Sequence, residues 1–272
     1  MAVCFAHLTD IHLKKDYATS TMTSDFGKTG NPTEKFLSAV EKIHAYENLD
    51  FILITGDLIH EGDEADYVFL KEILEKSFPD LPVILTLGNH DRVIPFRKVF
   101  LAEESEEPYN RIHEVNGLRI AILDAGHRPA AGEISDGQIE WLKDQLKVPA
   151  PLGTILALHQ PLITGFPLLD TSVRADFAEI LEQHDVIAIF SGHIHFTRFD
   201  FYGNVPHFVA GGMGFGAGIS PNRIVMNNHA SFNICRIENR KPSVVPVLVT
   251  PVPAEAQLFV IPEELLKKPQ VE

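Results

Sequence analysis

Five short segments of the sequence carry side chains that could do metal or acid–base chemistry. They contain carboxylate, amide and imidazole groups and no thiolate; in chain order the candidates are Asp10 and His12, Asp57, Asn89 with His90 and Asp91, His159, and His193 with His195. Such a donor set suits borderline or harder divalent ions such as manganese, iron, zinc or cobalt. Without His90 and Asp91, seven candidates remain. They exceed the three or four ligands of one zinc site and match two metals that share a bridging carboxylate.

The elements that must position these residues are apolar runs, each of which stops where a candidate residue begins. The runs predict strands over residues 3–9, 50–55, 82–87, 154–158 and 186–191. Strand-then-helix units in succession predict a mostly parallel sheet, in which ligands bind beyond the carboxyl ends of the strands. Residues 88–91 taken alone are better explained as a polar turn that caps a strand. Five strand ends of the same kind predict a site.

Helical spacing and capping residues predict the helices between these strands. They begin at Pro32 behind the N-cap Asn31, run over 64–78, begin behind Ser135, and run over about 172–184. Beyond His195 the pattern changes to alternating strands of a largely antiparallel sheet, interrupted by a glycine run at residues 211–218. That run lacks the GxxxxGK[ST] pattern of a phosphate-binding loop, so we expect a flexible connector there.

Composition limits the classes of protein to which the chain can belong. Its 272 residues are 45% hydrophobic, and no stretch approaches the ~20 apolar residues of a membrane span. With no signal-peptide pattern at the start, we expect a cytoplasmic protein without a membrane partner. The formal net charge of −14 argues against polymeric nucleic acid as a partner. Cys4 and Cys235 lie in predicted strands and receive neither a disulfide nor a catalytic role.

The remaining polar residues are weaker candidates. His7 lies inside the first strand, where a hydrogen-bonded core imidazole is expected. Other histidines fall at predicted helix ends or loops and are expected on the surface: His44, His60, His113, His127 and His184. His207, His229 and Asp124 are minor candidates for lining the pocket. Residues 17–29 read either as a recognition loop over the site or as a plain exposed loop.

The order and spacing of these segments resemble a known family. The blocks Asp10-x-His12, Gly56-Asp57, Gly88-Asn89-His90-Asp91, His159 and Gly192-His193-x-His195 are similar to those of the calcineurin-like metallophosphoesterases. Within that family, the length and the absence of appended domains look like the bacterial class III cyclic nucleotide phosphodiesterases and related glycerophosphodiesterases. Two departures are Gln160, where a second histidine is common, and the 211–218 run, which replaces a segment that shapes the substrate pocket.

The resemblance implies a fold and a set of residue roles. The fold is a four-layer α/β/β/α sandwich of two mixed sheets flanked by helices, as a single domain over residues 1–250 with a tail over 251–272. One of two divalent metals would be held by Asp10, His12, Asp57 and His195, and the other by Asp57, Asn89, His159 and His193, with Asp57 as the bridge. A metal-bound hydroxide would attack phosphorus. His90 would face the leaving oxygen, and Asp91 would either orient His90 or cap the turn.

The expected activity is therefore hydrolysis of a small-molecule phosphodiester, and the resemblance points to a 3′,5′- or 2′,3′-cyclic nucleotide. A glycerophosphodiesterase or a broad phosphodiesterase is the alternative. A catalytically inactive scaffold would be expected to lack ligands, and none is missing; a nuclease disagrees with the negative charge. A homodimer that uses the C-terminal sheet or tail is also predicted.

Overall fold

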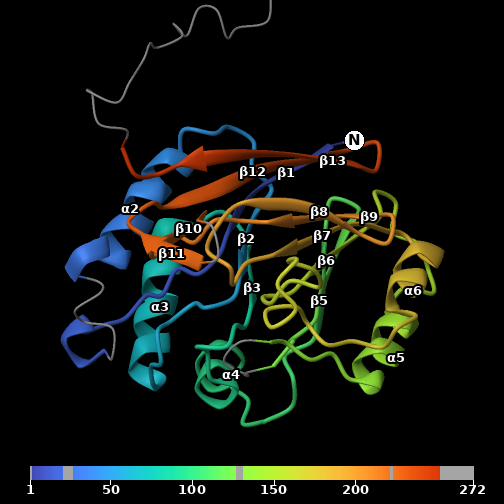
Figure 1. Cartoon of the computed structure of the whole chain (residues 1–272), viewed down its shortest axis with the longest axis horizontal. Coiled ribbons are helices and arrows are strands. Elements are labelled where there is room, and N and C mark those ends of the chain that lie inside the picture. The colour runs from blue at the N-terminus through green and yellow to red at the C-terminus, as the bar shows by residue number, and fades with distance from the viewer. Residues whose placement is uncertain (1, 21–26, 127–130, 221–222, 252–272) are drawn as a thin grey trace, which may run out of the picture.

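Two mixed β-sheets lie face to face at the centre of the molecule (Figure 1). A computed structural model describes residues 2–20, 27–126, 131–220 and 223–251. The first sheet has the order β13-β12-β1-β2-β3 and the second the order β4-β5-β6-β7-β9-β8. The strands of the first sheet are β1 (Ala2–Leu8), β2 (Phe51–Thr55), β3 (Val83–Thr86), β12 (Ser231–Glu238) and β13 (Lys241–Leu248). Those of the second are β4 (Arg111–Val115), β5 (Leu118–Ile122), β6 (Thr154–Ala157), β7 (Val186–Ser191), β8 (Arg198–Tyr202) and β9 (Val205–Val209).

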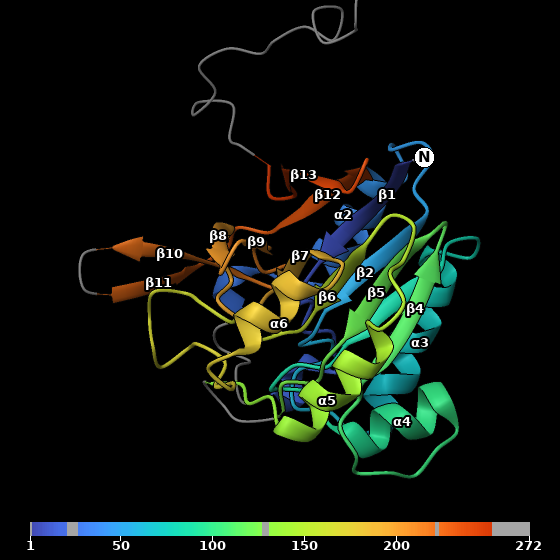
Figure 2. The ribbon, with the colours of Figure 1, turned by 90° about the vertical axis from the view of Figure 1, so that its right-hand side faces the viewer.

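Helices cover the outer face of each sheet. The first sheet carries α2 (Pro32–Ile43) and α3 (Glu64–Ser77), and the second carries α5 (Asp136–Gln145) and α6 (Phe177–Gln183), which lie on opposite sides of the molecule in Figures 1 and 2. A further helix, α4 (Val93–Leu101), packs beside α3. These layers confirm the predicted α/β/β/α sandwich. No helix in the described ranges is long and apolar enough to cross a membrane.

Aromatic side chains from both sheets fill the space between them. Phe5 of β1 stacks on Phe51 of β2 at 4.5 Å between ring centroids and meets Phe190 of β7 edge-on at 5.3 Å. All three rings are fully buried. Because burying such a ring contributes about 1.5–3 kcal/mol, this contact holds the two sheets in a fixed relation. The sheet edge where the polar segments meet is fixed with it.

The central strands are parallel, which brings their carboxyl ends to one edge. β1 pairs with β2 and β2 with β3 in parallel, and β5, β6, β7 and β9 are parallel in the second sheet. Each parallel return is made through a helix or an extended crossover, as the alternating pattern of the sequence predicts. The five polar segments therefore leave their strands at neighbouring points.

Three local predictions were wrong. The helix expected over 172–184 begins only at Phe177, because Ser172 is held in an extended bridge by hydrogen bonds with Gly132 and Ile134. The C-terminal strands do not form one antiparallel sheet: β8 and β9 join the second sheet, and β12 and β13 join the first. The glycine run is not a flexible connector, since its second half forms β10 (Gly216–Ser220), paired with β11 (Arg223–Asn227). The single-domain boundary at residue 250 stays a prediction, and residues 252–272 lie outside the described ranges.

Candidate metal centre

The predicted ligands follow the strand ends in an unusual backbone conformation. Asp10, His12, Asp57, His193 and His195 all have positive φ, between 46° and 71°. Left-handed backbone is uncommon for residues other than glycine and costs about 1–3 kcal/mol when the surroundings enforce it. Five of the eleven such residues in the described ranges are predicted ligands. The backbone is therefore strained at these five residues, in a conformation that directs their side chains toward one point.

One group of four predicted ligands is assembled. Ligand atoms of Asp10, His12, Asp57 and His195 lie within 4.8 Å of one another, and all four residues are buried. His195 Nε2 lies 3.2 Å from Asp10 Oδ1, and His12 Nε2 lies 3.6 Å from Asp57 Oδ2. The spacing of these donor atoms fits the coordination sphere of one divalent ion.

The second group meets the first through Asp57. His159 Nε2 lies 3.4 Å from Asp57 Oδ1 and 3.2 Å from Asn89 Oδ1. The rings of His159 and His193 are 5.2 Å apart between centroids, and the backbone N–H of His193 donates to Asp10 Oδ2 at 2.9 Å. Each oxygen of Asp57 therefore faces a histidine of a different group. We call the seven residues, Asp10, His12, Asp57, Asn89, His159, His193 and His195, the strand-end cluster.

Unpartnered polar atoms inside the cluster show that it suits divalent metals. Asp10 Oδ1 and His12 Nε2 are buried and have no hydrogen-bond partner among the described residues. A buried polar atom left without a partner costs about 1–3 kcal/mol, which a bound cation would remove. The donors are oxygen and imidazole nitrogen, as borderline metals prefer.

Bonds to backbone carbonyls fix the orientation of two imidazoles of the cluster. His159 Nδ1 is 2.8 Å from the carbonyl oxygen of Thr55, and His195 Nδ1 is 2.8 Å from that of Phe215. Because a carbonyl only accepts, both Nδ1 atoms carry the proton and donate it. The Nε2 atoms consequently face the centre, as in most histidine-bound metals.

Charge within the cluster is redistributed by burial. Burial opposes ionisation of Asp57, yet contact with His159 and His12 holds the pKa of this carboxyl well below its usual value. Burial likewise opposes protonation of His159, but Asp57 and Asp10 raise the pKa of this imidazole to about 9. Without a metal, the centre therefore stores a proton on His159. A metal that binds there must release it.

The glycine run at residues 211–218 packs so closely against this cluster that a larger residue would not fit. A Cβ atom on Gly212 would lie 2.5 Å from His195 Nδ1 and 2.3 Å from the carbonyl oxygen of Phe215. The N–H groups of Met213 and Gly214 donate to the carbonyls of Thr9 and Asp10. Residues 211–218 are therefore packed against two ligand-bearing loops.

Lys35 of α2 supports the same segment from behind. Its ammonium donates to the carbonyl oxygen of Gly214 at 2.9 Å, and burial lowers the pKa of Lys35 to about 8. The next residue, Phe215, accepts the bond from His195. No sequence pattern signals this contact, since it joins residues 179 positions apart.

The turn at residues 88–91 divides into two environments. The side chain of His90 is 29% exposed and stacks on His60 at 4.6 Å between centroids, while its backbone N–H donates to Asp57 Oδ1 at 2.9 Å. Asp91 is buried and accepts from the N–H groups of Gly88, Leu58 and Ile59 and from the hydroxyl of Tyr67. These bonds are those of a turn cap. They favour that alternative for Asp91, whereas an orienting role toward His90 stays a prediction.

His60 is a site residue that the sequence reasoning missed. It was expected on the surface, but it is 1% exposed and its Nδ1 lies 3.1 Å from His12 Nδ1. Burial lowers its pKa to about 4, so His60 is neutral and can accept the Nδ1 proton of His12. Its position three residues after Asp57, on the same loop, could have indicated that His60 lies near the site.

The minor candidates have structural partners. His7 is buried, as expected, with Nε2 2.9 Å from Thr55 Oγ1; His207 is also buried, with Nε2 2.7 Å from Ser191 Oγ. Asp124 accepts from the N–H groups of Tyr109 and Gly126. In the predicted recognition loop, residues 17–29, the hydroxyl of Tyr17 donates to the carbonyl oxygen of His12 at 3.1 Å. Residues 21–26 of this loop lie outside the described ranges.

Comparison with known proteins decides the family. The model of the calcineurin-like phosphoesterases matches residues 5–196, which include every member of the strand-end cluster. The chain belongs to the calcineurin-like phosphoesterase family. The predicted resemblance is thereby confirmed.

Curated relatives within this family have related names. A probable cyclic nucleotide phosphodiesterase of Rhodococcus erythropolis is 37% identical over 59% of this chain and 56% of its own length. A cAMP/cGMP dual specificity phosphodiesterase of Mycobacterium tuberculosis is 38% identical over 59% of this chain and 53% of its own. A probable glycerophosphodiester phosphodiesterase of Arcobacter nitrofigilis is 26% identical over 54% and 56%. The matched part spans about half the length of each relative.

A solved structure supports the fold of this calcineurin-like phosphoesterase. The purple acid phosphatase of yellow lupin seeds superimposes with a TM-score of 0.67 at 14% identity, over 95% of this chain and 53% of that chain. Identity at this level supports the architecture alone. The two packed sheets are thus those of the family.

Proposed function

We propose that this chain is a metal-dependent phosphodiesterase that hydrolyses a small phosphodiester, with a cyclic nucleotide as its substrate. The observation that carries the proposal is the position of Asp57, whose two oxygens face histidines of two ligand groups at 3.4 and 3.6 Å. A carboxylate shared in this way is what a two-metal centre needs. The names of the relatives at 37–38% identity support the choice of a cyclic nucleotide.

The strand-end cluster would hold the two metals in the sets expected from the sequence. Asp10, His12, Asp57 and His195 would form one set, and Asp57, Asn89, His159 and His193 the other. Manganese, iron, zinc and cobalt all suit these donors. When bound, the metals would lower the pKa of a water and neutralise the phosphate oxygens.

The residues of the chain supply orientation and a proton. His159 and His195 are held by backbone carbonyls, so their Nε2 atoms cannot turn away from the centre. His90 lies against His12 at 5.3 Å between centroids and is partly exposed, so a substrate can reach its ring. We assign to His90 the donation of a proton to the leaving oxygen, which contributes about 10²–10⁴-fold when well placed.

A glycerophosphodiester or a broad range of diesters is the second candidate, which the Arcobacter relative supports. The net charge of −14 disfavours polymeric nucleic acid as substrate. An inactive scaffold is disfavoured because no predicted ligand is absent from the chain. The cytoplasmic location and the homodimer stay predictions.

A substrate panel tests the proposal. The manganese-loaded protein is assayed side by side on 3′,5′-cAMP, 2′,3′-cAMP, glycerophosphocholine and bis(p-nitrophenyl) phosphate. We expect the highest kcat/KM on one of the cyclic nucleotides. Activity on bis(p-nitrophenyl) phosphate alone would contradict the cyclic nucleotide assignment, and activity on none of the four would contradict a phosphodiesterase.

A further inference from the structure

The two carboxylate oxygens of Asp10 have different surroundings. Asp10 is fully buried, and its Oδ1 lies 3.2 Å from His195 Nε2 with no hydrogen-bond partner among the described residues. Its Oδ2 instead accepts two hydrogen bonds, one from the backbone N–H of His193 at 2.9 Å and one from the hydroxyl of Thr9 at 2.8 Å. One oxygen is therefore left for a cation, and the other is occupied by the protein itself.

Thr9, the residue between β1 and Asp10, is fully buried as well. Its hydroxyl lies 2.8 Å from Asp10 Oδ2 and 2.8 Å from the carbonyl oxygen of Thr55. That carbonyl already accepts from His159 Nδ1. A hydroxyl has one proton to donate, and a carboxylate is a stronger acceptor than a neutral carbonyl. The proton of Thr9 therefore goes mainly to Asp10.

Glycine at position 192 leaves the space in which this hydroxyl lies. Gly192 directly precedes His193, and a Cβ atom on it would overlap Thr9 Oγ1 and lie 2.7 Å from Asp10 Oδ2. Because the interior is close-packed here, any larger residue would displace the hydroxyl or the carboxylate. Contact with the end of the first strand thus explains the glycine at the start of the block Gly192-His193-x-His195.

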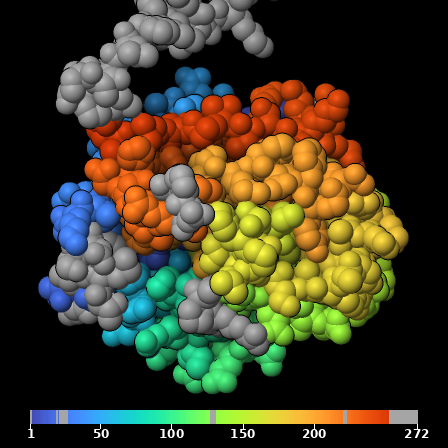
Figure 3. Space-filling view, in the orientation of Figure 1, coloured from blue at the N-terminus to red at the C-terminus, as the bar shows by residue number. Residues whose placement is uncertain are grey.

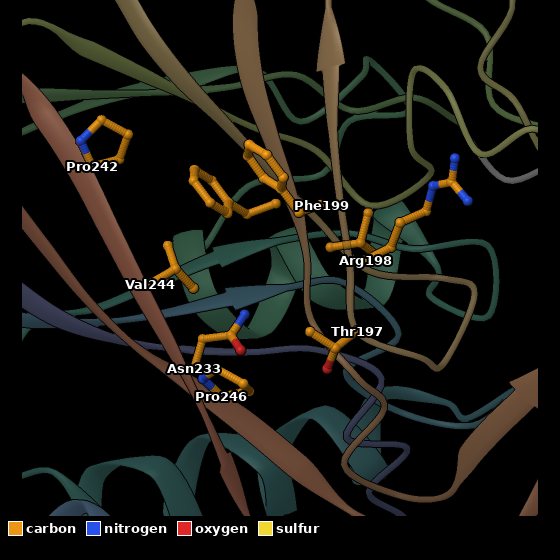
Figure 4. Close-up of a pocket in the computed structure, with 9 residues that line it drawn as sticks. Thr197, Arg198, Phe199, Asn233, Pro242, Val244 and Pro246 are labelled. Atoms are coloured by element: carbon orange, nitrogen blue, oxygen red, sulfur yellow. The ribbon is translucent and has the colours of Figure 1, made fainter.

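The hydroxyl of Thr55, at the end of the neighbouring strand β2, has a different partner. It lies 2.9 Å from Nε2 of His7, whose Nδ1 lies 3.5 Å from the amide nitrogen of Asn233. Asn233 lines an apolar groove between β8 and β13, which meet on the face shown in Figure 3 with red above light orange; Figure 4 shows this groove from close by. Neither His7 nor Asn233 is a predicted ligand. Of the two threonine hydroxyls, that of Thr9 is the one that supports the strand-end cluster.

We propose that the Thr9 hydroxyl is a positioning group for the metal centre, which holds Asp10 so that its Oδ1 faces the ion of the first ligand set. This inference deepens the proposed function and rests on the two metal sets given there. Because the hydroxyl proton goes to a ligand of the first set, loss of the hydroxyl weakens binding of that ion and leaves the second ion in place. Loss of an outer hydrogen bond to a metal ligand typically lowers metal affinity about 10–100-fold.

A matched pair of variants isolates the hydroxyl. Thr9→Ser keeps it and Thr9→Ala removes it, and both lack the methyl group. Titration of the metal-free proteins with manganese, followed by calorimetry and by electron paramagnetic resonance, measures both affinities and shows whether the two ions are magnetically coupled. We expect Thr9→Ser to bind two coupled ions as the wild-type protein does. Thr9→Ala should bind one ion with unaltered affinity and the other about 10–100-fold more weakly, so that the spectrum of a single uncoupled ion persists in it.

Thr154→Ser and Thr154→Ala form the control pair. Thr154 is also fully buried, and its hydroxyl donates to the buried carboxylate of Asp185 at 3.0 Å, but neither residue belongs to the strand-end cluster. Both variants should bind two coupled manganese ions, and Thr154→Ala should melt at a lower temperature than Thr154→Ser. Melting curves of the metal-free proteins establish that each variant is folded; Thr9→Val, which keeps the volume of the side chain, takes the place of Thr9→Ala if the latter is unfolded.

The outcomes separate this inference from the proposed function. Equal manganese binding by Thr9→Ala and Thr9→Ser would overturn the role of Thr9, as would equal weakening of both ions or the same loss in Thr154→Ala. Failure of the wild-type protein to bind two ions would overturn the metal sets and this inference together. If the wild-type protein binds two ions but hydrolyses no diester of the panel, the proposed function fails, and the comparison of Thr9→Ala with Thr9→Ser still decides the role of Thr9.

Discussion

Two regions of this molecule bury histidines, and they do so in opposite ways. In the strand-end cluster, His12, His159 and His195 lie beside carboxylates at the edge of the sheets. Within the sheets, His7 and His207 lie inside regular strands and meet the hydroxyls of Thr55 and Ser191. We call the second pair the strand histidines. Both regions exclude water almost completely.

At His159 the carboxylate partners outweigh burial and decide the charge of the imidazole, whereas at His12 burial outweighs Asp57 and holds the pKa well below its usual value. Burial lowers the pKa of His7 and of His207 to about 3, since a hydroxyl does not stabilise the cation. Asp57 and Asp10 overcome the same burial at His159 and raise its pKa to about 9. A buried histidine is therefore evidence for a metal site only where carboxylates and unpaired lone pairs accompany it.

The strongest way to break this comparison is to remove the carboxylate that both ligand groups share. Asp57→Ala should reduce bound metal from two ions to one or none and lower kcat/KM at least about 10⁴-fold, because the charge that holds both ions and the chemistry they supply are lost together. Metal content by emission spectrometry and turnover on the panel measure this.

Asp124→Ala is the control for that substitution. Asp124 is equally buried and accepts from the backbone N–H groups of Tyr109 and Gly126, so its loss should lower the melting temperature while two metals remain bound. Full metal content in Asp57→Ala would show that the two-metal assignment is wrong.

A second substitution separates the metal ligands from the histidine at their rim. His90→Ala should keep both metals and lower kcat by about 10²–10⁴-fold, since His90 meets the cluster through an edge-on ring contact with His12 and through its backbone N–H. His229→Ala, an exposed histidine, should leave both quantities unchanged. Loss of metal in His90→Ala would make His90 a ligand.

The sequence predicts this cluster well because each member directly follows a strand that the local sequence pattern reveals. Each ligand follows a strand, and parallel strands must end at one edge, so Asp10, Asp57 and His159 could be placed together without coordinates. The layered fold followed from the same alternation. What supports the cluster depends on contacts between distant segments, and neither periodicity nor capping signals report such contacts.

Two errors show this limit. The glycine run at 211–218 reads as flexible because its composition suits a loop, yet close approach to His195 is what requires Gly212. His60 reads as exposed because polar loop residues usually are, yet the turn after Asp57 folds it back onto His12. In both cases the decisive partner is a ligand on another strand.

The pairing of His60 with His12 allows a finer test within the cluster. His60→Leu removes the acceptor for the Nδ1 proton of His12, and loss of such an outer hydrogen bond typically weakens metal binding 10–100-fold. Competition with a chelating dye on the wild-type and variant proteins measures the affinity. His60→Gln, which restores an acceptor, should recover part of the lost affinity. If His60→Leu binds the metal as tightly as the wild-type protein does, His60 does not support the site.

The smallest expected effect concerns the strand histidines. Between pH 6.5 and about 3 the unfolded chain binds a proton at His207 that the folded protein does not, so stability falls as the pH is lowered through this range. From pH 7.5 to 5.5 the loss in the free energy of unfolding is about 1.4 kcal/mol for each such histidine.

His207→Gln keeps a polar group for Ser191 but cannot titrate. Urea unfolding of chelator-treated protein should therefore show about 1.4 kcal/mol less loss in His207→Gln than in the wild type, whereas the exposed control His229→Gln should lose as much as the wild type. Equal pH dependence in all three proteins would mean that His207 is protonated in the fold, and the contrast between hydroxyl and carboxylate partners would fail.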